Sequence, residues 1–320
     1  MKNLIFRADV RQKIDRRVDK LLRDLGNPAP PLRLEDVREL LRLDLGYYQS
    51  DSDGVLRRAA HTIVMAGKQV WAEPRRLLDA VKKWSIKALW VPDRRRILID
   101  EQLPKPKHRW AEGHEITHSI LDWHEVALHG DTEVTMKPSC LDKVEAEANY
   151  GAGQLLFLRE RFVAEVMSSA PSIELVKRLA DDFKNTKAST LWRLVETVGR
   201  QRPILGVMHY HPAPRFASDK NDPANPCRHF IRSDAFAAMF SETTELAVFE
   251  CIKSYIEPKQ GGPVGTNIVI LTDDNCEEHE FTFESFKFRH ECLTLAVHHG
   301  KRPTVVPVKG LRGSNIVVAS

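Results

Sequence analysis

The chain has 320 residues, a formal net charge of +4 and 42% hydrophobic residues. This length predicts one large or two ordinary domains, and the apolar content excludes wholesale disorder. No uninterrupted apolar run reaches about 18 residues, which argues against a membrane span and a membrane partner. The N-terminus soon turns charged and has no signal-peptide core, so we expect a cytoplasmic protein.

The cysteines indicate a reduced protein without a cysteine-based metal site. Their number is odd, they are widely spaced, and no CxxC pair occurs. A zinc knuckle and a redox pair are therefore not expected, and in the cytoplasm the thiols should stay reduced. The five positions are Cys140, Cys227, Cys251, Cys276 and Cys292.

The first part of the chain, residues 1–85, is expected to be mainly helical. A basic helix covers Ile14 to Leu25, one break covers Gly26–Pro31, and another break lies around Gln49–Gly54. The arginines of these stretches have two interpretations. They form a solvated face, which is the commoner case, or they contact an acidic partner or phosphate.

A hairpin is predicted next. The apolar run Ile86–Val91 and the run Arg94–Asp100 flank a turn at Pro92-Asp93. A strand at this position has two possible roles. It is either a plain core strand or an edge that accepts an extended substrate as an additional strand.

A predicted helix that begins near His108–Trp110 carries the pattern HExxH, from His114 to His118. Residues four apart on a helix project from one face, so two imidazoles at this spacing can share one Zn²⁺. Glu115 lies beside the first histidine, where it can accept a proton from an attacking water. The alternative is a surface helix with two solvated histidines. Mn²⁺ or Fe²⁺ would also suit two histidines and a carboxylate, but this motif favours zinc.

The third ligand has three candidates, His124, Glu145 and Glu147. Leu121 favours a continued helix, which would turn His124 about 120° away from His118. Glu145 and Asn149 share one face of a predicted helix, whereas Glu147 points to the opposite side. We therefore expect Glu145 to bind the metal and Asn149 to orient a zinc-bound histidine through the second ring nitrogen.

The combination of HExxH with Glu145-x-x-Ala148-Asn149 about thirty residues later resembles the ImmA/IrrE family of zinc metallopeptidases, over roughly residues 10–200. The resemblance implies a gluzincin-like, mainly helical zincin domain. It also implies a protein substrate, often a helix-turn-helix repressor that is cut in response to stress. Three positions depart from the family. Gly151 stands where an aromatic residue is frequent, Thr117 where glycine is common, and Phe157-Leu158 where a Met-Pro pair is frequent.

The composition changes near Arg200–Pro203, and strand-like sequence follows. One long helix, Asp234–Ile256, separates the early strands from the later ones, and Gln260–Pro263 reads as a loop. Phe281, Phe283, Phe286 and Phe288 suggest a strand pair with a bulge near Ser285. The histidines of this region match no metal signature, and its role is unassigned. The predicted strands are Ile204–Tyr210, His229–Ile231, Asn267–Leu271, Glu280–Phe288, Leu293–Val297 and Asn315–Val318.

The sequence therefore predicts an α+β protein. Residues 1–200 would form a mainly helical zinc metallopeptidase domain with a small sheet, and residues 201–320 a smaller α+β domain with a largely antiparallel sheet. The predicted activity is that of a zinc-dependent endopeptidase with one Zn²⁺ per chain. The ligands would be His114, His118 and Glu145, Glu115 would be the general base, and Asn149 would orient a ligand.

Two functions of other classes remain open. In the first, the chain is a DNA-binding regulator that uses its basic N-terminal helices or the helical pair at Ile173–Val198. Nucleic acid is the less favoured partner, because the second helix of this pair offers few side chains for base contacts. In the second, the chain is an interaction protein whose metal site is structural or inactive. The sequence does not determine the oligomeric state.

Overall fold

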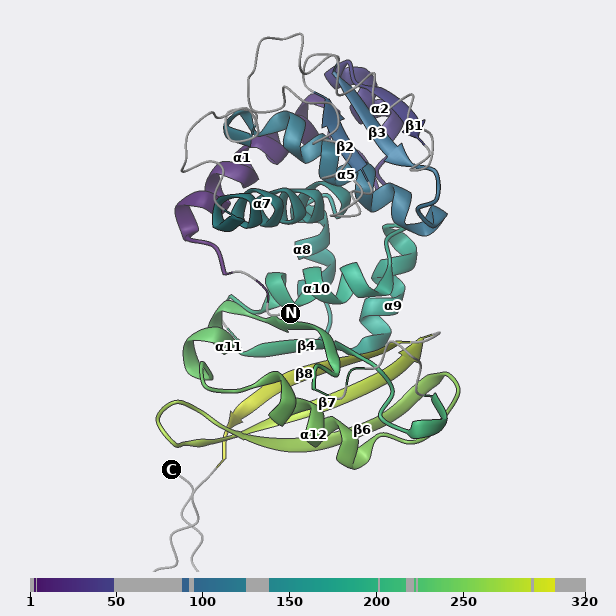
Figure 1. The fold of residues 1–320 in the computed structure, drawn as a ribbon. Coiled ribbons are helices and arrows are strands. Elements are labelled where there is room, and N and C mark those ends of the chain that lie inside the picture. Colours follow the sequence, from purple (N-terminus) through teal and green to yellow (C-terminus); the bar gives the residue numbers. More distant parts are fainter. Residues whose placement is uncertain are drawn as a thin grey trace, which may run out of the picture. The chain divides into compact units, whose positions relative to one another are not determined.

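The computed structural model describes residues 3, 5–48, 88–91, 95–124, 138–200, 202–216, 222, 224–288 and 291–302 (Figure 1). It is an α+β structure with two sheets, as the sequence predicts. The chain forms two compact units. One comprises Leu4–Glu165 and Arg178–Ser189, and the other comprises Met1–Asn3, Val166–Lys177 and Thr190–Ser320. The division into domains at residue 200 stays a prediction.

Helices dominate the first unit, which also holds a small sheet. Within the described part of the chain, no helix is long and apolar enough to cross a membrane. The predicted helical pair at Ile173–Val198 is confirmed. The elements up to this pair are α1 (Ala8–Asp24), α2 (Leu34–Leu41), β1 (Asp44–Tyr48), β2 (Ala88–Val91), β3 (Arg96–Asp100), α5 (Lys105–Ile120), α7 (Pro138–Leu156), α8 (Glu160–Met167), α9 (Ile173–Asp182) and α10 (Lys187–Val198).

The small sheet has the strand order β1-β3-β2. The predicted hairpin is confirmed, because β2 and β3 pair antiparallel with Trp90 opposite Ile97. The expectation of mainly helical sequence before the break around Gln49–Gly54 is wrong for Asp44–Tyr48, which forms β1 and pairs parallel with β3. Arg42 ends α2 in the left-handed conformation, with φ of 52°. Pairing of Asp44–Tyr48 with the buried central strand β3 then outweighs the weak helix propensity of these five residues.

The second unit contains a five-stranded sheet of order β5-β4-β8-β7-β6 in which all neighbouring strands are antiparallel. Apolar side chains from these strands and from two helices form one buried core, with Phe230, Phe236, Phe281 and Phe283 fully buried. The predicted strand Asn315–Val318 lies outside the described residues. The elements are β4 (Ile204–His209), β5 (Cys227–Arg232), α11 (Asp234–Met239), α12 (Glu245–Tyr255), β6 (Gly262–Thr272), β7 (Glu278–Phe288) and β8 (Glu291–Lys301).

Three details of the second unit differ from the prediction. The single long helix is two helices, because Thr244 caps α12 by accepting a hydrogen bond from the backbone N–H of Ala247. The loop predicted at Gln260–Pro263 is partly strand, since β6 begins at Gly262. The bulge predicted near Ser285 is present in the strand pair, but it lies on the partner strand, because the register of β6 against β7 shifts between Pro263 and Gly265, which face Phe286 and Ser285. β7 is one strand whose alternate side chains stay buried through Ser285.

Ser285 occupies an inward position because its hydroxyl group has partners there. The hydroxyl oxygen of Tyr255 and Oγ1 of Thr294 each lie 2.7 Å from Oγ of Ser285. Oγ1 of Thr294 also lies 2.8 Å from Nε2 of His209, whose Nδ1–H donates to the carbonyl of Tyr210. This hydrogen-bonded chain allows polar groups to stay buried between strands at little cost.

The stability of this unit should fall in acid because of His209. Burial disfavours the imidazolium form and lowers the pKa of His209 to about 4. The unfolded chain therefore takes up the proton first, as the pH falls below about 6.5. We expect this group to cost about 2 kcal/mol of unfolding free energy at pH 5 relative to pH 7.5. Urea unfolding at both pH values, compared with His209→Gln, measures the difference. An equal loss of unfolding free energy at pH 5 in the wild type and in His209→Gln would contradict this role of His209.

Candidate metal centre

The two histidines of the HExxH pattern lie side by side on α5, as the helical spacing predicts. The ring centroids of His114 and His118 are 4.8 Å apart, and their Nε2 atoms are 3.1 Å apart. Both rings are largely buried, with 14% and 4% of the side chains exposed. Burial, together with the nearby His114, lowers the pKa of His118 to about 3, so this ring is neutral and offers a lone pair.

Glu145 reaches these histidines from α7. Its Oε2 lies 3.1 Å from Nε2 of His114, and its Oε1 lies 3.6 Å from Nε2 of His118. Zinc bonds of about 2.0–2.1 Å in tetrahedral geometry place ligand atoms roughly 3.3 Å apart. The three measured separations of 3.1, 3.1 and 3.6 Å lie on either side of that value. These residues therefore fit a single zinc ion.

Glu115 lies beside this cluster and is 6% exposed. Burial raises the pKa of its carboxyl group to about 7, although the nearby His114 and a hydrogen bond from the backbone N–H of Trp90 act in the opposite direction. A carboxylate with a pKa near neutrality can both accept and return a proton at physiological pH. Glu115 thus has the chemistry that a general base requires.

Asn149 contacts the first histidine. Its Oδ1 lies 3.1 Å from Nδ1 of His114 and accepts the ring N–H. In the neutral ring this hydrogen bond places the proton on Nδ1 and leaves the lone pair of Nε2 facing Glu145. The arrangement is the one that the spacing of Glu145 and Asn149 on one helical face predicts.

His124 does not face away from the cluster, and the expectation of a continued helix is wrong. α5 ends at Ile120, and Leu121 is extended, with φ of −101° and ψ of 92°. His124 then turns back, and its Nδ1 lies 3.0 Å from Nδ1 of His118. Leu121 is fully buried, and this packing outweighs the preference of leucine for helix.

Glu147 also differs from the prediction, because it does not point away from the site. Its Oε2 lies 3.1 Å from Nε2 of His124 and accepts a hydrogen bond of 2.7 Å from the indole N–H of Trp123. A side chain two positions from Glu145 emerges on another flank of α7, yet the turn after α5 brings His124 to that flank. The sequence pattern contained no signal for this contact.

Close packing of α5 against α7 brings Glu145 to the histidines. A Cβ atom at Gly151 would lie 2.4 Å from Cγ2 of Thr117, and one at Gly113 would lie 3.0 Å from the side chain of Leu156. Gly151 and Thr117 are two of the departures from the family pattern noted above. They face each other, so a small residue on one helix accommodates the larger residue on the other.

Two residues near the motif that could stabilise an oxyanion are engaged elsewhere. The hydroxyl group of Tyr150 donates to Oδ1 of Asp15 at 3.1 Å and accepts from the amide of Gln154. His124 is held between His118 and Glu147. Neither side chain is free to donate a hydrogen bond to a substrate carbonyl.

A second cluster, in the second unit, is explained by a turn. Donor atoms of Asp273, Glu277 and His279 lie within 4.8 Å of one another. Oδ1 of Asp273 accepts the backbone N–H groups of Asn275 and Glu277, and Glu277 forms an ion pair with Lys301. Oδ2 of Asp273 is 3.4 Å from Nε2 of His279. These contacts close the hairpin between β6 and β7.

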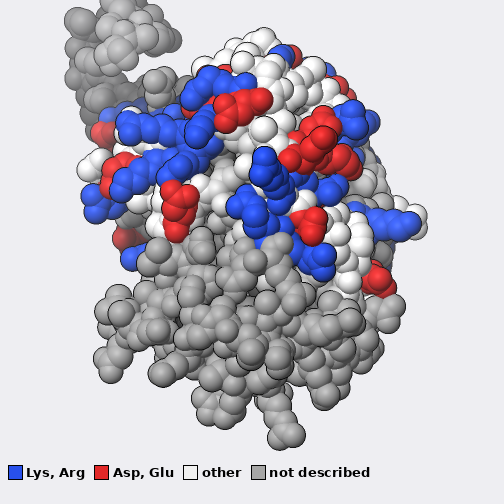
Figure 2. Space-filling view, turned by 90° about the horizontal axis from the view of Figure 1, so that it is seen from above, with Lys and Arg blue, Asp and Glu red and all other residues white. Residues whose placement is uncertain are grey.

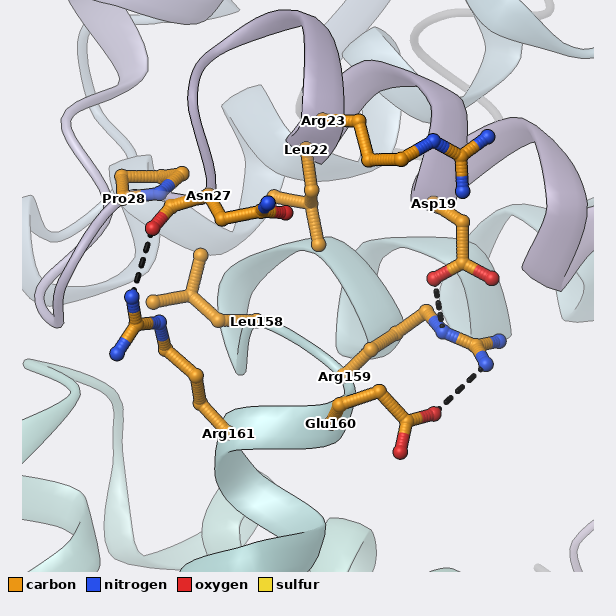
Figure 3. A pocket seen from close by; sticks show the side chains of 9 residues that line it. All are labelled: Asp19, Leu22, Arg23, Asn27, Pro28, Leu158, Arg159, Glu160 and Arg161. Atoms are coloured by element: carbon orange, nitrogen blue, oxygen red, sulfur yellow. Dashed lines mark hydrogen bonds and ion pairs between the residues drawn. The ribbon is translucent and has the colours of Figure 1, made fainter.

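A pocket of about 460 Å³ lies away from the histidines, between the end of α1 and the start of α8 (Figure 3). Its arginines are largely engaged within the protein. Arg159 forms ion pairs with Asp19 and Glu160, and Arg161 donates to the carbonyl of Asn27. The carboxylates of Asp19 and Glu160 therefore offset the charge of Arg159, whereas the carbonyl bonded to Arg161 is neutral.

Positive charge near the N-terminal helices is also partly neutralised. Figure 2 shows Lys and Arg side chains interspersed with Asp and Glu on one face. Arg17 pairs with Asp122, and Arg33 pairs with Asp36. Mixed charge of this kind weakens the potential that would attract phosphate. DNA binding by these helices stays a less favoured prediction.

Comparisons with known proteins agree with the resemblance drawn from the motif. Residues 75–195 match the model of the IrrE N-terminal-like domain, a peptidase family. This segment contains His114, Glu115, His118, Glu145 and Asn149. Among solved structures, a Mycobacterium tuberculosis transcriptional regulator is similar, with 10% sequence identity and a TM-score of 0.49 over 98% of this chain and 94% of that chain. No curated protein matches the sequence.

Proposed function

We propose that this chain, whose residues 75–195 match the IrrE N-terminal-like domain, is a zinc-dependent endopeptidase that cleaves a protein substrate. One observation carries the proposal. Two imidazole nitrogens and one carboxylate converge with separations of 3.1 to 3.6 Å, and a buried carboxyl group lies beside them. This is the donor set of a catalytic zinc with two histidines and a glutamate.

In this proposal His114, His118 and Glu145 hold the ion, and Asn149 keeps the ring of His114 in the required tautomer. Zinc held by these residues would lower the pKa of a water molecule towards about 7 and polarise the scissile carbonyl group. Glu115 accepts the proton from the attacking water and delivers it to the leaving amine. The burial that raises the pKa of Glu115 to about 7 suits both transfers.

The substrate class follows from the resemblance. Proteins of this type are similar to site-specific proteases that cut repressor-like regulators. We therefore infer that the substrate is a protein, with a helix-turn-helix repressor encoded nearby as the first candidate. An extended segment of such a substrate could add to an edge of the sheet β1-β3-β2, in which β2 is an outer strand beside Glu115.

Metal content of the purified full-length chain tests this proposal. Elemental mass spectrometry should find about one zinc per wild-type chain and little in His114→Ala or Glu145→Ala, because two remaining ligands bind zinc weakly. Glu160→Ala is the matched control, since this glutamate is 76% exposed on α8. A folded wild-type chain that takes up no metal would overturn the proposal.

A further inference from the structure

The turn after α5 creates a chain of contacts that leads away from the candidate metal centre. The backbone N–H of His124 donates to the carbonyl of Leu121 at 2.8 Å, and the His124 side chain is fully buried. Its Nδ1 faces Nδ1 of His118 at 3.0 Å, and its Nε2 faces Oε2 of Glu147 at 3.1 Å. The three groups form the continuous series His118–His124–Glu147.

The protons of this series can be assigned from its carboxylate end. The Glu147 carboxylate only accepts hydrogen bonds, so Nε2 of His124 must carry a proton. A neutral His124 ring then leaves Nδ1 as an acceptor, and Nδ1 of His118 must be the donor. A neutral His118 protonated on Nδ1 presents the lone pair of Nε2 towards Glu145 and His114. The hydrogen bonds of the series thus suffice to set this tautomer.

The same logic applies on the other side of the centre. Asn149 accepts the Nδ1–H of His114 directly. Glu147 accepts the corresponding proton of His118 only through an intervening ring. α7 therefore carries, at alternate positions, one ligand and the two acceptors that set the tautomers of the other two ligands.

We propose that His124 and Glu147 are positioning residues that hold His118 in the ring orientation and tautomer needed to bind zinc. This inference rests on the proposed function. Neither residue belongs to the converging donor set of His114, His118 and Glu145. His124, which was rejected as a ligand on sequence grounds, acts through its contact with His118. Trp123 supports the series by donating its indole N–H to Glu147 at 2.7 Å.

Zinc affinity is the first readout, measured on the full-length chain by competition with a chromophoric chelator. His124→Phe keeps the bulk of the ring but removes the acceptor, and we expect zinc to bind about 10–100-fold more weakly. His124→Asn restores an acceptor and should recover most of that loss. Glu147→Leu should weaken binding, whereas Glu147→Gln, which retains an accepting oxygen, should stay close to wild type.

His108→Phe is the control, because His108 lies on α5 and its ring contacts the carbonyl of Leu103 at 2.6 Å and the ring of Tyr47, neither of which belongs to the proposed series. Its zinc affinity should equal that of the wild type. If His124→Phe does not fold, the comparison of Glu147→Leu with Glu147→Gln decides the question. Equal zinc affinity in the wild type and in both acceptor-removing variants would overturn the positioning role of His124 and Glu147. The proposed zinc site itself would still stand.

Nitrogen-15 NMR of the histidine side chains gives a second readout that separates positioning from general packing. In the zinc-loaded wild type, His118 should carry its proton on Nδ1, and that proton should exchange slowly because it is hydrogen-bonded and buried. Exchange should be faster in His124→Phe and slow again in His124→Asn. The same exchange rate in the wild type, His124→Phe and His124→Asn would contradict the positioning role of His124. A wild type that binds no zinc would overturn both the positioning role and the proposed function.

Discussion

Glu115→Gln should reduce peptide cleavage by about 10²–10⁴-fold while the chain still binds one zinc. Glutamine has nearly the same shape as glutamate but cannot accept a proton, so the substitution removes the proposed general base without emptying the buried position. Glu115 does not belong to the converging donor set of His114, His118 and Glu145, which is why the metal should stay bound. Cleavage of a co-expressed candidate repressor, followed by mass spectrometry, and zinc content measure the two effects separately.

The control for this variant is Glu112→Gln. Glu112 lies one turn earlier on α5, is also buried, and accepts a hydrogen bond of 2.7 Å from Arg38 that an amide oxygen can retain. Its cleavage rate should stay close to that of the wild type. Full activity in Glu115→Gln would exclude Glu115 as the base. Loss of both cleavage and zinc in this variant would show that the residue acts on the metal site instead.

Phe283→Ala should destabilise the second unit by about 3–5 kcal/mol, the usual cost of emptying a phenylalanine site in a core. Phe283 is fully buried on β7, in the core that the sheet shares with α11 and α12. A loss of this size is a large part of the 5–15 kcal/mol that stabilises a typical domain. Urea unfolding gives the free energy, and hydrogen exchange of β7 and β8 reports whether the change is local to this sheet.

Phe288→Ala provides the comparison on the same strand, since Phe288 is 39% exposed. Its effect should be much smaller, within about 0.5–1 kcal/mol, because little apolar surface returns to water. Similar losses for both variants would mean that β7 does not separate a buried from a solvated face. The zinc content of both proteins should equal that of the wild type, because β7 carries none of the proposed ligands.

Several features were predictable because they depend on short-range patterns. HExxH places two histidines on one face of any helix, so their proximity needed only the helix itself. The spacing of Glu145 and Asn149 likewise fixed their common face, and the hairpin of β2 and β3 followed from two apolar runs around a turn. The alternation of apolar residues predicted most strands of the second sheet.

Other features were decided by contacts between segments that are distant in the sequence. β1 is a strand because β3 offers a partner, although the sequence predicts a mainly helical segment here. Ser285 keeps its inward position because Tyr255 of α12 and Thr294 of the neighbouring strand β8 form hydrogen bonds with it. The phenylalanine spacing on β7 suggests a bulge at this point, and the pairing places the register shift on the partner strand, between Pro263 and Gly265 of β6.

The metal centre shows the same division. The sequence by itself determined the candidate ligands, since a helix and a family motif specify His114, His118 and Glu145. Only the tertiary structure decided what surrounds them, because the end of α5 depends on the burial of Leu121 and on where α7 lies. That turn carries His124 to Glu147, and hydrogen bonds between side chains 23 residues apart have no periodic signal in a sequence.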